Sequence, residues 1–166
     1  MSDPINVPAS VVRVQAALTR LGAAGEIRAL DASARTAKEA ADTLGVDVGQ
    51  IANSLVFWAD DSPLLVIASG AHRVDTSAIA DVCGYSTITK ANADQVRSAT
   101  GFVIGGVAPV GSVESIPTVI DTCLDQYEQV WAAGGHSHWV FPTSFAELLH
   151  ITGGQAASIG MTTEGG

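Results

Sequence analysis

The stretch ANSLVFWADDSPLLVIA, residues 52–68, decides the fold class of this chain. Residues 52–59 and 64–68 are mostly apolar and rich in aliphatic and aromatic side chains, which is typical of buried strands. The intervening DDSP, residues 60–63, has the composition of a turn. We therefore expect two neighbouring strands that pair as an antiparallel hairpin.

Capping patterns on both sides of this hairpin predict helices. Ser10, Thr36, Asp75, Asn92 and Ser144 can each cap a helix N-terminus, and a glycine follows each segment. Because helices and strands do not alternate strictly, we expect an α+β (mixed α/β) fold, with a central mixed, mostly antiparallel sheet surrounded by helices. We expect one domain over residues 1–166 with a frayed tail at 159–166. The expected helices are 10–21, 36–45, 75–83, 92–100 and 144–152, and the other expected strands are 27–30, 102–105, 117–121, 128–132 and 137–141.

The composition is that of a globular protein with few charges. Of the 166 residues, 47% are hydrophobic and 15% are charged, and no apolar run reaches the roughly 18 residues of a membrane span. The N-terminal residues lack a basic start and an apolar core, so we expect no signal peptide and a cytoplasmic location. The formal net charge of −9 comes without a basic cluster. Any contact with nucleic acid is therefore expected to be small or assisted by a partner.

A second stretch, GFVIGGVAPVG at residues 101–111, is expected to pass from a strand into a glycine-rich loop. Gly105, Gly106 and Gly111 permit positive φ or a close backbone approach, and Pro109 removes one N–H donor. Such a loop can aim backbone N–H groups at a carbonyl or a phosphate. A tight turn between two strands is the alternative interpretation.

Small polar residues and histidines are the other candidates for a site. Asn53 and Ser54 enter an otherwise apolar strand, where they could face a pocket or bond local backbone. His136 and His138 are separated by one residue in an expected strand, so both should point to one face. They could line a pocket, serve structure or bind a metal. His72 is a candidate for the rim of the pocket.

No metal site and no cofactor are expected from the spacing of the ligand-type residues. The pair His136 and His138 lacks further ligands nearby in sequence, and no nucleotide-binding motif is present. The two cysteines, Cys83 and Cys123, fall in apolar segments and share no metal-ligand spacing. We expect both to be buried free thiols.

Four segments, taken in order, resemble the YbaK / prolyl-tRNA-synthetase-associated editing domain family. QIANSLVF at residues 50–57 is similar to the family's QIVKSLVF strand, and residues 64–75 resemble its next strand and helix. Residues 100–111 contain the family's Gly-x-x-x-Pro loop, and residues 131–142 resemble its closing strands. The resemblance covers about residues 10–158.

The resemblance implies an aminoacyl-tRNA deacylase, which hydrolyses the ester between a wrong amino acid and the 3′ adenosine of tRNA. Such domains work free-standing, as trans-editing hydrolases, or within prolyl-tRNA synthetases. The implied partners are the aminoacyl-tRNA 3′ end and an aminoacyl-tRNA synthetase, with no membrane, and the implied assembly is a monomer or homodimer. The loop at 105–109 would stabilise charge on the carbonyl, and a small apolar pocket would sort side chains. The implied catalytic residues are Asn53, Gly105 and Gly106, and the implied substrate-binding residues are Ser54, Val107, Ala108, Pro109, His138, His136 and His72.

The chain departs from this family at one position. The family has lysine where this chain has Asn53, and neither Lys38 nor Lys90 aligns with it. Asparagine donates a hydrogen bond but supplies no charge, so we expect the site to lack a compact cation. Two alternatives follow: a relative that binds an aminoacyl or nucleotide-like ligand without turnover, and an interaction module that docks on a synthetase.

Overall fold

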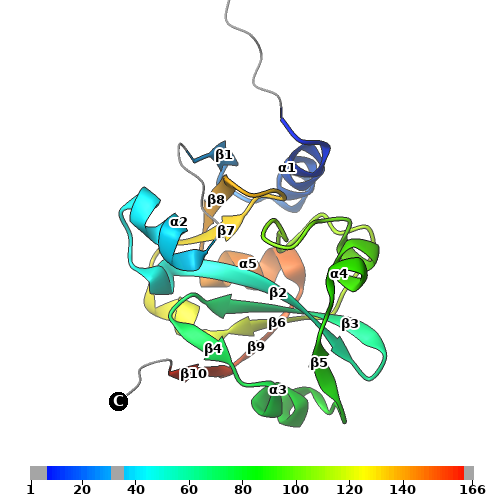
Figure 1. Cartoon of the computed structure of the whole chain (residues 1–166). Coiled ribbons are helices and arrows are strands. Elements are labelled where there is room, and N and C mark those ends of the chain that lie inside the picture. Colours follow the sequence, from blue (N-terminus) through cyan, green and yellow to red (C-terminus); the bar gives the residue numbers. More distant parts are fainter. Residues whose placement is uncertain (1–6, 31–35, 163–166) are drawn as a thin grey trace, which may run out of the picture.

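The computed structural model describes residues 7–30 and 36–162, which form a mixed sheet flanked by helices (Figure 1). The larger sheet has the strand order β1-β8-β7-β2-β3-β6-β9, with β5 paired to β2, and β4 pairs with β10 separately. Antiparallel pairings outnumber parallel ones, as expected. The strands are β1 (Arg28–Ala29), β2 (Ile51–Ala59), β3 (Ser62–Ser69), β4 (His72–Val74), β5 (Ile88–Lys90), β6 (Thr118–Asp121), β7 (Val130–Ala133), β8 (Trp139–Thr143), β9 (Gln155–Ala157) and β10 (Gly160–Thr162).

Most helices begin and end at the expected capping residues. The Thr36, Asp75, Asn92 and Ser144 side chains accept backbone N–H groups at the starts of α2 to α5, and left-handed glycines end these helices. The first helix differs, because Pro8 occupies the N-cap position and no side chain caps it. The helices are α1 (Ala9–Leu21), α2 (Ala37–Leu44), α3 (Thr76–Cys83), α4 (Ala93–Thr100) and α5 (Phe145–Thr152), with 3-10 helices η1 (Val48–Gln50) and η2 (Thr122–Gln126).

The expected hairpin is confirmed as the pair β2 and β3. The register runs from Ala52 opposite Ser69 to Ala59 opposite Ser62, so Asp60 and Asp61 alone form the turn. Both turn residues have positive φ, at 46° and 70°. The Asp60 carboxylate also accepts the N–H groups of Ser86 and Thr87, just before β5. These hydrogen bonds lower the pKa of Asp60.

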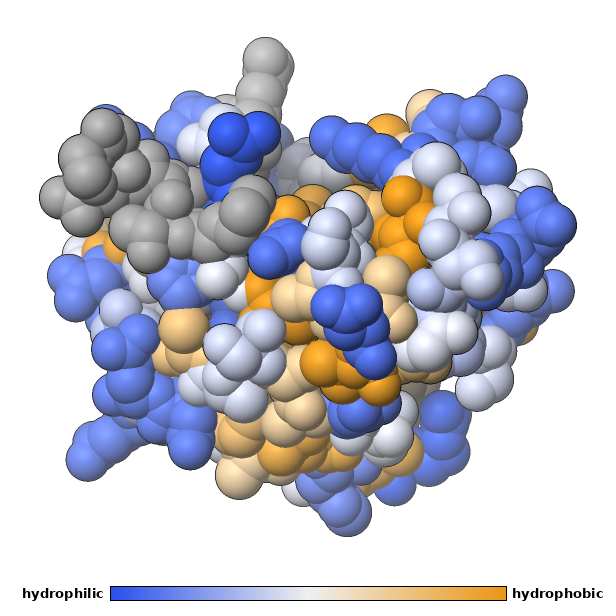
Figure 2. Space-filling model, turned by 90° about the horizontal axis from the view of Figure 1, so that it is seen from below, coloured by the Kyte–Doolittle hydropathy of each residue, from blue (hydrophilic) through white to orange (hydrophobic). Residues whose placement is uncertain are grey.

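Apolar side chains fill both faces of the sheet. On one face, residues of α1, α4 and α5 pack with the even-numbered side chains of β2, such as Val56. On the other face, Phe57 packs with Ile79 of α3, and Ile51 packs with Ala40 of α2. The face seen from below carries apolar side chains in its middle with polar ones around them (Figure 2). No helix among the described residues is long and apolar enough to cross a membrane.

Three expectations about secondary structure are wrong. Residues 102–105 form no strand, because Phe102 anchors a turn in the core while Val103 and Ile104 are exposed. His136 and His138 lie in the turn between β7 and β8 rather than in a strand. The frayed tail is wrong for residues 159–162, because Ile159 is fully buried and β10 pairs with β4. Residues 163–166 lie outside the described part of the chain.

Candidate functional site

A gap in the pairing of β2 marks the candidate site. One edge of β2 pairs with β3 along residues 52–59. The other edge pairs with β7 at residues 51–52 and with β5 at residues 57–59. Among the described residues, no strand covers residues 53–56 on that edge. Unpaired backbone groups are therefore available there, as at any open strand edge.

The pleat of β2 identifies which groups face this gap. The Ile51 carbonyl accepts the Gly70 N–H, on the side of β3, so the backbone groups of Asn53 and Leu55 point the same way. Those of Ser54 and Val56 point to the gap, and the Val56 carbonyl indeed accepts the N–H of Ala91 there. The register thus directs the N–H and C=O of Ser54 into the gap. The Ser54 hydroxyl is also buried, and it has no hydrogen-bond partner in the described part of the chain.

A cavity of about 570 Å³ occupies the gap. Its wall combines segments that are far apart in sequence: α2, β2, β4, β5, β7, the loop at 104–107 and the turn at 136–140. Of the residues proposed from the sequence, the wall includes Asn53, Ser54, Gly105, Val107, His136, His138 and His72.

The glycine-rich loop reaches the cavity at Gly105 and Val107. Gly105 has φ +94°, a conformation that favours glycine. A Cβ atom on Gly106 would lie 2.7 Å from the His136 Cα atom, so Gly106 allows the loop to pack against the β7–β8 turn. The Gly106 N–H donates to the Val103 carbonyl at 3.0 Å, so it is not free to bind substrate. In the described chain, the amides of Gly105 and Val107 make no such bond.

Two proposed binding residues of this loop do not lie on the cavity wall. Ala108 is 2% exposed and packs in the core beside α1 and α5, and Pro109 is buried as well. These two buried residues anchor the loop to the core. The sequence could not separate them from Gly105 and Val107, because the direction of each residue in an irregular loop depends on its tertiary contacts.

The two histidines of the β7–β8 turn lie on the cavity wall, and the backbone of His138 is unusual. His138 has φ +75°, which is uncommon for a residue with a side chain. Its carbonyl accepts the N–H of Leu30 at 2.6 Å, which ties the turn to β1. The His136 carbonyl accepts the Trp139 N–H at 3.1 Å. Left-handed backbone at a non-glycine residue is often found where structure serves a function.

Cations do line the cavity, contrary to the expectation from position 53. Lys90 lies on β5 opposite Phe57, and Arg73 lies on β4. Cross-strand partners point to one face of a sheet, and Asn53 lies on that same face of β2. Lys90 thus supplies positive charge to the wall from a neighbouring strand. The sequence did not indicate that Lys90 lies on the cavity wall, because a strand of three residues carries almost no periodic signal.

The cysteines are free and partly exposed, rather than buried as expected. Burial still raises the pKa of the Cys83 thiol, so this side chain is a poor nucleophile. Cys123 lies in η2, close to Asp121 and to His72 of the cavity wall.

Comparisons with known proteins agree with this arrangement. The Aminoacyl-tRNA editing domain family matches residues 31–151. The uncharacterized protein YwhH of Bacillus subtilis is 28% identical over 86% of this chain and 91% of its own length. EbsC of Enterococcus faecalis, a candidate Cys-tRNA(Pro)/Cys-tRNA(Cys) deacylase, is 24% identical over 75% of this chain and 76% of its own.

Among solved structures, a candidate trans-editing enzyme for prolyl-tRNA synthetase is 40% identical, with a TM-score of 0.88. The match covers 94% of this chain and 99% of that one. The fold and the sequence match therefore agree over nearly the whole chain. This chain belongs to the aminoacyl-tRNA editing domain family.

Proposed function

We propose that the protein is a trans-editing deacylase, which removes a wrong amino acid from the 3′ end of a mischarged tRNA. The observation that carries this proposal is the open edge of β2, which faces the glycine-rich loop across one cavity. Ser54, Gly105 and Val107 border that cavity, and we assign their backbone N–H groups as the fixed donors that stabilise a carbonyl oxygen as it gains negative charge.

The reaction needs no covalent intermediate on the protein. Water adds to the ester carbonyl, and the carbonyl oxygen becomes an oxyanion that accepts hydrogen bonds from the backbone N–H groups. The bond from the carbonyl carbon to the ribose oxygen then breaks, and the proton lost by the water passes to that ribose oxygen. Lys90 and Arg73 attract the phosphates of the tRNA end to the same wall. Asn53, exposed on this wall, donates a neutral hydrogen bond.

The wall favours a small amino acid. Ala40, Ala52, Ala132 and Ala133 border the cavity together with Val107. Large side chains on the same wall, Phe57, Trp131 and Trp139, limit the room for a bulky amino acid by steric overlap, and such a pocket separates small amino acids from one another only weakly. We therefore expect hydrolysis of esters of small amino acids and rejection of aromatic ones.

The overall charge makes unaided binding of tRNA weak. With a net charge of −9, the chain has few cations to neutralise phosphates beyond those on the cavity wall. We propose that a synthetase, of the prolyl class by the kinship above, delivers the charged tRNA in the cytoplasm. Low ionic strength should strengthen the productive contact.

The test is a deacylation screen with tRNAs charged with alanine, serine, cysteine, threonine and phenylalanine, with and without prolyl-tRNA synthetase. We expect release of a small amino acid and none of phenylalanine. Failure to hydrolyse any of these esters, with or without the synthetase, would overturn the proposal and favour ligand binding without turnover. Asn53→Lys in the same screen separates two roles of position 53. A faster variant indicates that charge limits the wild type, and a slower one indicates that Asn53 is a specific donor.

A further inference from the structure

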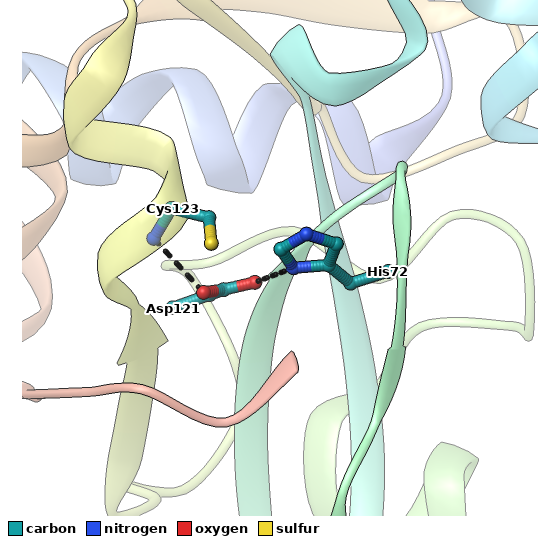
Figure 3. Close-up of side chains that lie close together, drawn as sticks. All are labelled: His72, Asp121 and Cys123. Atoms are coloured by element: carbon teal, nitrogen blue, oxygen red, sulfur yellow. Dashed lines mark hydrogen bonds and ion pairs between the residues drawn. The ribbon is translucent and has the colours of Figure 1, made fainter. Parts of the chain in front are cut away.

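A second cluster of chemically active side chains includes His72 of the cavity wall. His72 comes from β4, Asp121 from the end of β6, and Cys123 from η2 (Figure 3). One ligand-type atom of each side chain lies within 4.8 Å of those of the other two. The three residues come from separate elements and share no spacing motif, which is why the sequence predicted no metal site.

The contact between His72 and Asp121 has an unusual length. The His72 Nδ1 atom lies 3.4 Å from Asp121 Oδ2, longer than a good hydrogen bond between these groups. Nδ1 is buried and has no hydrogen-bond partner among the described residues. Ligands held about 2.0–2.3 Å from a tetrahedral zinc ion lie about 3.3–3.7 Å apart. The observed separation thus fits two ligands of one ion better than a donor and its acceptor.

The carboxylate of Asp121 is fixed in place and fully buried. Its Oδ1 atom accepts the Cys123 N–H at 2.9 Å, and its Oδ2 atom accepts the Ser69 N–H at 3.1 Å. These bonds hold the carboxylate between the imidazole and the thiol (Figure 3). A buried carboxylate is stabilised by paired charge or by a bound metal ion, and Oδ2 keeps a lone pair for such a partner.

We infer that His72, Asp121 and Cys123 form a binding site for a zinc ion, with water in the fourth position. Nitrogen and sulfur ligands select zinc over magnesium and calcium, which prefer oxygen. A neutral imidazole, a carboxylate and a thiolate together balance the charge of Zn²⁺. The sulfur lies within 4.8 Å of the other two ligand atoms and must move closer to them to complete tetrahedral geometry. This inference does not depend on the proposed deacylase activity.

Zinc binding requires that the thiol lose its proton. Burial and the neighbouring Asp121 carboxylate both raise the pKa of the Cys123 thiol. Zinc would release this proton on binding, as it does from other cysteine ligands. The ion would also link β4, β6 and η2.

Gly160 of β10 lies against the imidazole of His72. A Cβ atom on Gly160 would collide with the His72 Nδ1 atom, so only glycine leaves the imidazole where it is. Gly160 pairs with Val74 of β4 and thereby fixes the strand that carries His72. Gly160→Ala therefore displaces the imidazole while all three ligands stay in the chain.

The experiment uses the whole chain, freed of metal by a chelator and then titrated with Zn²⁺ and, separately, Co²⁺. We expect one zinc ion per chain, retained through gel filtration, and a thiolate-to-cobalt charge-transfer band. Cys123→Ser should abolish that band, and His72→Ala and Gly160→Ala should weaken zinc binding by at least about a hundredfold. Matched controls are Cys83→Ser and His150→Ala, whose side chains lie outside the cluster.

Two outcomes would overturn the inference. One is a wild-type chain that retains no zinc after gel filtration. The other is a cobalt band that persists in Cys123→Ser or disappears in Cys83→Ser. Circular dichroism of each variant shows whether it is folded, and Gly160→Ala provides a second test if removal of a ligand unfolds the chain.

Discussion

Single side chains decide how charge reaches the cavity. Asn53 leaves its own position neutral, while Lys90 brings an ammonium to the wall from β5. We predict that Lys90→Met, which keeps an apolar stem but removes the charge, lowers kcat/KM for deacylation by about ten- to a hundredfold. The matched control is Lys38→Met on α2, because Lys38 is exposed and does not line the cavity. Equal losses in both variants would show that only overall charge matters.

Two adjacent glycines affect the loop for different reasons. In Gly106→Ala the new Cβ atom meets the backbone of His136, so the loop and the β7–β8 turn must separate. In Gly105→Ala there is open space, and only the φ of +94° is unfavourable. We predict that Gly106→Ala is destabilised by about 1–3 kcal/mol, and Gly105→Ala by about 1 kcal/mol. Urea unfolding measures both, and the reverse order would contradict the packing described here.

His138 has an unfavourable backbone conformation and also lies on the cavity wall. Glycine tolerates its φ of +75°, whereas alanine does not. We predict that His138→Gly is more stable than His138→Ala by about 1 kcal/mol. Both variants should lose deacylation activity equally, because both lack the imidazole. If the glycine variant kept full activity, the imidazole would have no part in catalysis or binding.

At the scale of elements, the β2–β3 hairpin holds β5 through the turn residue Asp60. Its carboxylate accepts two N–H groups just before β5, and these bonds lower its pKa. A carboxylate with a lowered pKa stabilises the fold above the pKa of the unfolded chain, and this stability is lost as pH falls through the folded pKa. We predict that wild type is more stable than Asp60→Asn at neutral pH. The difference in the free energy of unfolding should vanish in strong acid. Urea unfolding from neutral to acidic pH measures it, and a difference that stays constant with pH would contradict the prediction.

Elements with local signals were predictable from the sequence, and elements without them were not. The capping residues of α2 to α5 placed those helices, and two apolar runs on either side of a turn placed the hairpin. The strand expected at residues 102–105 does not form. Phe102 is buried because it anchors the loop in the core, and not because it pairs with a neighbouring strand. The strands β4, β5, β9 and β10 have three residues each, which is too short for a periodic pattern.

At the scale of the whole molecule, the candidate site is a property of topology. Asn53, Ser54, Gly105 and Val107 were selected from the sequence, and the structure brings them to one cavity. The reason they meet there, a break between β7 and β5 along one edge of β2, has no sequence signature. The same holds for the cluster of His72, Asp121 and Cys123, whose members come from three elements.

We propose that the aminoacyl ester is hydrolysed inside the cavity at the open edge of β2. The most direct measurement is single-turnover hydrolysis of the preferred mischarged tRNA by a variant with a filled cavity. Ala133→Trp places a large side chain on the wall at the end of β7, and Val82→Trp places one on the exposed face of α3. We predict that Ala133→Trp remains folded but loses hydrolysis, while Val82→Trp hydrolyses at the wild-type rate. Hydrolysis at the wild-type rate by folded Ala133→Trp would show that the reaction takes place outside this cavity.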